Sequence, residues 1–216
     1  MIHYGNITKL TSNGIYVELE ENVMREVLRL RKGNTSLVEI RLNDPRRITN
    51  DQRKKFYATL KDIHRHTGWL VEELKDIFKA EYMCRNALDS LSLSDCSITD
   101  ARGLINLVMQ FVVHYGIPLT DFGVNRTDDI NEFLYCCIME KKCCVCGSDM
   151  VHVHHCTGSK VGMGNNRNKI DNIGRYIVTL CAKHHDECHV DEIKFMDKWH
   201  IYGIKVNEEI AEKLNL

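Results

Sequence analysis

The sequence has few of the features that mark fibrous, disordered or membrane-embedded proteins. Only 2 of the 216 residues are proline, and hydrophobic residues at 44% accompany charged residues at 27%, as in ordinary globular chains. No apolar run approaches the roughly 18 residues that a bilayer-spanning helix needs. The first residues, MIHYGNITKL, have neither the basic nor the apolar segment of a secretory signal, so we expect a cytoplasmic protein without a membrane partner.

The sequence also lacks a large net charge. The formal net charge is −1, so any contact with nucleic acid must come from local basic patches. Residues 41–65 carry eight Lys and Arg against three Asp and Glu, and residues 141–185 carry seven against two. Each patch is consistent with a solvated surface or with a phosphate-binding surface.

Cysteine is abundant and unevenly distributed. Eight of the ten Cys and seven of the eleven His fall between Cys136 and His200. Because disulfides are uncommon in cytoplasmic proteins, this clustering points to metal binding.

The pattern of apolar and turn residues predicts an α+β fold, in which a mixed β-hairpin and helical domain precedes a small cysteine-rich module. Strands are expected at ITKL and GIYVELE around an Asn13-Gly14 turn with positive φ, and at SLVEIRL. ENVMREVLRLRK can form a short helix. Longer amphipathic helices are expected within residues 52–68, 69–82, 97–115 and 128–141, with Phe56, Leu60 and Ile63 on one face of the first.

A Cys-x2-Cys pair and a Cys-x2-His pair lie at the two ends of the expected module. Two thiolates in a Gly-closed turn can reach one tetrahedral ion, and Zn2+ accepts three Cys and one His. The predicted structural zinc ligands are Cys143, Cys146, Cys181 and His184. Cys144, Cys156 and Cys188 are possible substitutes for one ligand.

A second set of histidines is left over once this zinc site is filled. His152 and His154 share one face of an expected strand, and His155 lies on the other. His185 and His189 are spaced i, i+4 on the following helix, so their imidazoles can meet one metal. A purely structural zinc module would not need these residues.

The motifs CCVCG, HVHH and LCAKHHDECH together resemble the HNH, or ββα-metal, endonucleases. The stretches HHCTGSKVGMGNNRN and LCAKHHDECHVDEIKFMDKWH resemble the recombination-associated, Ref-type members found in phages. The resemblance implies that His154 binds a catalytic Mg2+ or Mn2+ together with His185 and His189, and that His155 is the general base. An exchange of roles between His152 and His154 is the main rival assignment.

The central Asn of the family is the one departure. Many members place it where this chain has Tyr176. Asn172 is the nearest upstream Asn, and it is the candidate for orienting His155. Four basic residues in or after the same loop are candidate phosphate contacts: Lys160, Arg167, Lys169 and Arg175.

The region 37–118 resembles phage NinB/Orf-type recombination mediators, through LVEIRLNDPRRITNDQRKKFYATLKDI and, more weakly, SLSDCSITDARGLINLVMQFVVHYGIPL. This resemblance implies a homodimeric module that binds single-stranded DNA. Five residues are candidate backbone contacts: Arg46, Arg47, Arg53, Lys54 and Lys55.

The sequence therefore predicts a DNA-binding domain at 1–140 and an HNH endonuclease module at 141–216. The predicted function is metal-dependent cleavage of single-stranded or branched DNA in phage or prophage recombination, in a bacterial host cytoplasm, with recombination proteins as possible partners. The alternative is a zinc-stabilised recombination mediator without activity, and a zinc-containing protein-interaction module is a third reading.

Overall fold

The computed structural model describes residues 3, 5–20, 22–30, 38, 40, 42, 44–159 and 172–216. The chain divides into two compact units, Met1–Asn43 and Asp44–Leu216. Within the described residues, no helix is long and apolar enough to cross a membrane. The expected mixture of helices with small sheets is confirmed in these residues.

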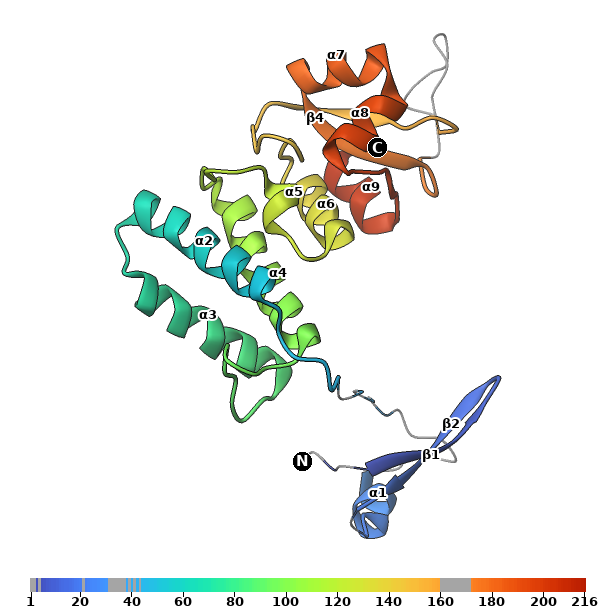
Figure 1. Cartoon of the computed structure of the whole chain (residues 1–216). Helices are drawn as coiled ribbons and strands as arrows, with labels where there is room; N and C mark the ends of the chain where they lie inside the picture. The colour runs from blue at the N-terminus through green and yellow to red at the C-terminus, as the bar shows by residue number, and fades with distance from the viewer. Residues whose placement is uncertain are drawn as a thin grey trace. The chain divides into compact units, whose positions relative to one another are not determined.

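The first unit contains an antiparallel hairpin and a short helix (Figure 1). Strands β1 (Gly5–Thr11) and β2 (Gly14–Leu19) confirm the expected hairpin, and α1 (Met24–Leu30) confirms the short helix. The expected positive φ is wrong, since neither Asn13 nor Gly14 has it. The two loop residues are Ser12 and Asn13, so Gly14 already lies in β2 opposite Thr11, where the backbone is extended.

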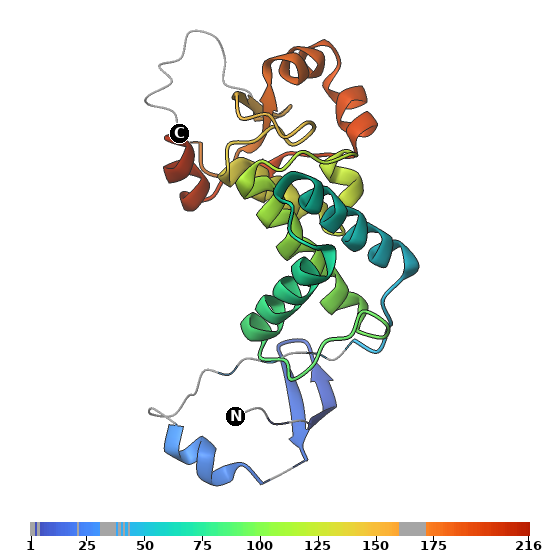
Figure 2. The same cartoon turned by 90° about the vertical axis from the view of Figure 1, so that its left-hand side faces the viewer.

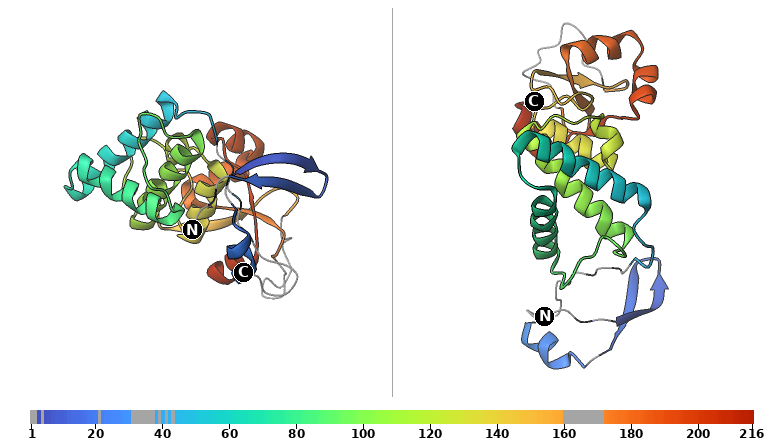
Figure 3. Two further views of the ribbon diagram at one scale, coloured as in Figure 1. Left: turned by 90° about the horizontal axis from the view of Figure 1, so that it is seen from below. Right: turned by 60° about the vertical axis from the view of Figure 1, so that its left-hand side comes forward.

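The hairpin has no buried face of its own. Every residue of β1 and β2 is exposed, and Figure 3 shows the pair as a two-stranded ribbon. Such a ribbon has little independent stability in water. The expected strand SLVEIRL falls mostly outside the described residues, and the three that are described, Val38, Ile40 and Leu42, lie in no strand.

The second unit begins with three packed helices (Figure 2), α2 (Asn50–Thr67), α3 (Val71–Asn86) and α4 (Ile98–Tyr115). Helix α2 starts at a capping box, in which Thr49 accepts from the Gln52 N–H and the Gln52 side chain accepts from the Thr49 N–H. Gly68, with φ 81°, ends it. As the periodicity predicts, its buried apolar face includes Phe56, Leu60 and Ile63.

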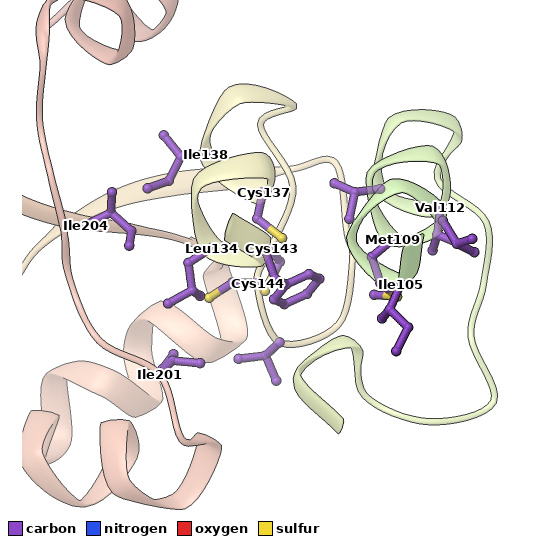
Figure 4. Close-up of a cluster of buried hydrophobic side chains, with 14 of the residues drawn as sticks. Ile105, Met109, Val112, Leu134, Cys137, Ile138, Cys143, Cys144, Ile201 and Ile204 are labelled. Carbon is purple, nitrogen blue, oxygen red and sulfur yellow. The ribbon is translucent and has the colours of Figure 1, made fainter. Parts of the chain in front are cut away.

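Two further helices lead from α4 to the cysteine-rich segment. They are α5 (Gly123–Arg126), which the sequence pattern did not predict, and α6 (Ile130–Met139). Figure 4 shows side chains of α4 and α6 in one cluster with Cys143, Cys144 and residues from the C-terminal segment. The helical part and the cysteine-rich part therefore share a hydrophobic core, which explains why no linker separates them near residue 140.

The C-terminal part holds a three-stranded antiparallel sheet in the order β3-β4-β5. Its strands are β3 (Val151–His155), β4 (Tyr176–Cys181) and β5 (Ile204–Lys205). Helix α7 (Ala182–Val190) follows β4 directly and contacts both β3 and β4. Helices α8 (Glu192–Trp199) and α9 (Glu208–Leu214) complete the chain. The β3-β4-α7 order brings residues about 30 positions apart onto facing surfaces.

Candidate metal centre and catalytic histidines

The turn after α6 and the junction between β4 and α7 together form a Cys3His cluster. The turn closes when the Gly147 N–H donates to the Cys143 carbonyl, and Gly147 has φ 73°. Two hydrogen bonds connect the turn to β4. The Cys144 N–H donates to the Thr179 carbonyl, and the Thr179 hydroxyl donates to the Lys142 carbonyl. Cys181 is the N-cap of α7, which places His184 one turn later beside it.

The four ligand atoms are spaced as a tetrahedral zinc site requires. The atoms of Cys143, Cys146, Cys181 and His184 all lie within 4.8 Å of one another. Cys146 Sγ lies 3.8 Å from Cys181 Sγ, and His184 Nδ1 lies 3.5 Å from Cys143 Sγ. Ligands about 2.0–2.3 Å from a tetrahedral ion are themselves about 3.5–3.8 Å apart. The donor set therefore fits Zn2+.

The pKa values of the cluster members are shifted in different directions. Burial raises the pKa of the Cys143 thiol to about 12. Burial also raises the pKa of Cys181, but hydrogen bonds from the His184 N–H and the Cys146 thiol outweigh it, and the pKa lies below its ordinary value. Burial lowers the pKa of His184, which favours the neutral imidazole that binds metal. A bound cation would supply the charge that Cys143 needs to ionise.

The three cysteines considered as substitutes lie outside this cluster of described residues. Cys144 is 1% exposed in the hydrophobic core, where burial raises the pKa of its thiol far above the ordinary value. Cys188 is fully buried on α7, with its Sγ 3.4 Å from His154 Nε2. Cys156 follows β3 and its N–H donates to the Tyr176 carbonyl.

A second cluster consists of three histidines between β3 and α7. The ligand nitrogens of His154, His185 and His189 lie within 4.8 Å of one another. The imidazole of His154 is 5.3 Å from that of His185 and 4.9 Å from that of His189, measured between ring centroids. His152 is exposed on the same face of β3, with its ring 5.5 Å from that of His185, outside the three-residue cluster. The structure thus brings the three predicted metal ligands together.

His154 is the buried member of this histidine cluster. It is 2% exposed, and burial lowers its pKa so that the neutral ring is favoured. Its Nδ1 is buried and has no hydrogen-bond partner among the described residues. A buried polar atom without a partner is costly, and a bound cation would satisfy it. The histidine cluster therefore fits a divalent ion as well.

The next residue of β3 contacts the candidate Asn. His155 is half-buried, and its Nε2 lies 3.2 Å from Asn172 Oδ1. Asn172 is itself 7% exposed, just before β4. Tyr176, at the position where the resemblance would lead one to expect the Asn, is 48% exposed at the start of β4. Folding thus brings an amide to His155 from a different position in the sequence.

Most of the candidate DNA contacts of the second unit have intramolecular partners. The Arg46 guanidinium pairs with Asp44, and Arg47 donates to the Asp95 carbonyl. Arg53 donates to the carbonyls of two residues before α4, Leu93 and Ser94. Arg47 and Arg53 therefore attach the start of α2 to the loop that precedes α4.

The two lysines of the same patch differ. Lys55 donates to the Thr127 carbonyl, and its Nζ lies 3.5 Å from Asp128. Lys54 is 80% exposed, and its one partner among the described residues is Asp51, in an ion pair of 3.7 Å. Of the four basic residues near the loop, Arg175 donates to the Ser159 carbonyl, and Lys160, Arg167 and Lys169 lie outside the described residues.

The sequence reasoning missed one side chain beside the histidine cluster. Glu192 at the start of α8 lies with its Oε2 3.6 Å from His154 Nε2, and its carboxylate also accepts hydrogen bonds from Thr157. Its only sequence signal is an acidic residue three positions after His189. Because α7 ends at Val190 and α8 begins a new axis, that spacing did not predict the contact.

Comparison with known proteins agrees with this geometry. No curated protein and no solved structure matches the chain. One family model, described as "Putative HNHc nuclease", matches residues 16–216, which include the Cys3His cluster, the histidine cluster, His155 and Asn172. A match over nearly the whole chain assigns the family, and the chain therefore belongs to this family of HNH nucleases.

Proposed function

We propose that the protein is a metal-dependent DNA endonuclease. The observation that carries this proposal is the pair of separate clusters. Three Cys and one His suffice to hold a structural zinc, yet His154, His185 and His189 form a second cluster, and His155 follows His154 on β3. A histidine set with no fourth protein ligand among the described residues leaves coordination positions for water and substrate, which is typical of a catalytic rather than a structural metal.

The two clusters have different tasks in this proposal. Zinc bound by Cys143, Cys146, Cys181 and His184 would hold the start of the C-terminal module against the β4-α7 junction. Mg2+ or Mn2+ bound by His154, His185 and His189 would stabilise the negative charge that develops on the scissile phosphate and the departing 3′ oxygen.

His155 is the general base and Asn172 its positioning residue. When Asn172 Oδ1 accepts a hydrogen bond from His155 Nε2, that nitrogen carries the proton, and Nδ1 holds the lone pair. This tautomer can take a proton from the attacking water at Nδ1. Neutral imidazole is suited to this step near physiological pH.

The broader role is cleavage of single-stranded or branched DNA in phage or prophage recombination. The resemblance of residues 37–118 to recombination mediators supports it, and so does the exposed Lys54 at the start of α2. A homodimer, in which two basic patches act together, is part of the same proposal.

The test is cleavage of single-stranded, duplex and branched DNA by the wild type and three variants, across a titration of Mg2+ or Mn2+. His155→Ala should cleave about two to four orders of magnitude more slowly at every metal concentration, because the base is lost and the metal is not. His154→Ala should recover part of its activity at high metal concentration, because it has lost a ligand.

His152→Ala is the matched control on the same strand. It should retain activity, since His152 lies outside the three-ligand cluster. Full activity in His155→Ala would refute the assignment of the base. A wild type that binds DNA but cleaves none of these substrates with either metal would favour the alternative function, a zinc-stabilised recombination mediator.

A further inference from the structure

The two nitrogens of His154 face different surroundings. Nδ1 is buried without a hydrogen-bond partner among the described residues, whereas Nε2 lies 3.6 Å from Glu192 Oε2. An imidazole that binds metal through one nitrogen commonly donates the N–H of the other to a carboxylate, which sets both the tautomer and the ring orientation.

We propose that Glu192 is a positioning residue for the catalytic metal, holding His154 as the Nε2–H tautomer with the Nδ1 lone pair directed to the ion. This inference rests on the proposed function, since it assumes that the cluster of His154, His185 and His189 binds the catalytic cation. It adds a residue from α8, outside the β3-β4-α7 arrangement that carries the cluster itself.

Glu192 is held in place from the opposite side. Its Oε1 accepts from the Thr157 N–H at 2.5 Å and its Oε2 accepts from the Thr157 hydroxyl at 2.7 Å. The Glu192 side chain is only 14% exposed, and the residue begins α8, where the helix dipole favours an ionised carboxylate. The carboxylate therefore spans from the loop after β3 to the buried ring of His154.

A carboxylate is the group suited to this position. An ionised Glu can only accept hydrogen bonds, so it favours a proton on the nitrogen that faces it. Among the described residues, Nε2 also lies 3.4 Å from Cys188 Sγ, and a thiol is only a weak acceptor. Glu192 thus decides which nitrogen is protonated, and with Nε2 protonated the lone pair lies on the partnerless Nδ1.

The experiment measures Mn2+ affinity by calorimetry on full-length, zinc-loaded protein. Glu192→Gln should weaken Mn2+ binding about 10- to 100-fold, the usual effect of losing such a partner. The amide can accept from the Thr157 N–H only by turning its NH2 toward His154, which favours the wrong tautomer. Thr157→Val, which loosens the carboxylate without removing it, should weaken binding less.

Glu187→Gln is the matched control, because it removes the same charge from α7 itself. Glu187 pairs with Lys198 and makes no contact with His154 among the described residues, so its variant should bind Mn2+ as the wild type does. A second readout is the 15N NMR signature of the His154 ring before Mn2+ is added. It should report the Nε2–H tautomer in the wild type and lose that preference in Glu192→Gln.

The outcomes separate this inference from the proposed function. Wild-type Mn2+ affinity in Glu192→Gln, together with a strong loss in His154→Ala, would overturn the role of Glu192 and leave the metal centre intact. The Nδ1–H tautomer in the wild type would also overturn it. Wild-type affinity in His154→Ala would remove the metal centre itself, and the inference with it.

Discussion

Removal of zinc from the Cys3His cluster should lower the free energy of unfolding of the second unit. The size of the loss depends on the number of residues between the two pairs of ligands. A zinc ion in the Cys3His cluster would join Cys143 to Cys181. A cross-link that closes a loop of roughly 40 residues stabilises a fold by about 4 kcal/mol, because it lowers the conformational entropy of the unfolded chain. For a unit of this size, 4 kcal/mol corresponds to a fall in Tm of about 8–16 °C. The helices α2, α3 and α4 have their own buried contacts, so they should stay folded.

The assay is scanning calorimetry with far-ultraviolet circular dichroism, before and after extraction of zinc by a chelator. Elemental analysis should find about one zinc per chain beforehand, because four closed ligands release the ion slowly. Cys181→Ser should reproduce the fall in Tm, and Cys84→Ser, at an exposed cysteine of α3 outside the cluster, should not. Less than about half an equivalent of zinc, or a Tm within about 2 °C after its verified removal, would refute the reasoning.

Two further predictions concern DNA binding and the base. Lys54→Glu should weaken single-stranded DNA binding and reduce the slope of log binding constant against log salt concentration by about 1, with Tm unchanged. Arg53→Glu should instead lower the free energy of unfolding by about 1.5–3 kcal/mol, because the variant loses hydrogen bonds to two carbonyls. An unchanged slope in Lys54→Glu would move the DNA site to the C-terminal part. Asn172→Ala should slow single-turnover cleavage on the order of 100-fold through misplacement of the base, with Mn2+ affinity unchanged; an undiminished rate would remove Asn172 from the catalytic set.

Because Arg47 and Arg53 have intramolecular contacts, a charge-reversal variant at either residue can lose DNA affinity through a loss of folding stability. Arg47 and Arg53 donate to backbone carbonyls near the start of α4, so replacing them perturbs folding as well as any contact with DNA. A loss of DNA affinity in such variants is informative only beside a measured Tm. Lys54 is the better probe, because its side chain is exposed and weakly paired.

The sequence by itself determined the elements that depend on neighbouring residues. Caps, glycines and apolar spacing located α2 and α4, since helix ends are set within a few positions of the chain. The same local logic paired Cys143 with Cys146 and Cys181 with His184, because two residues three apart can share one ion. The approach of His185 to His189 was also predicted from local spacing, because residues at i and i+4 share one face of a helix.

Only the tertiary structure decided which distant groups meet. Three sets of contacts show this: Asn172 with His155, Glu192 with His154, and Arg53 with the carbonyls of Leu93 and Ser94. The residues in each contact are from 17 to 41 positions apart in the sequence. Their contacts depend on where β4, α8 and α4 pack, and no periodicity in the sequence encodes such distances. Local patterns report bonds made within a turn or two, whereas a site assembled from a sheet and the helices α7 and α8 is fixed by the burial of a shared core.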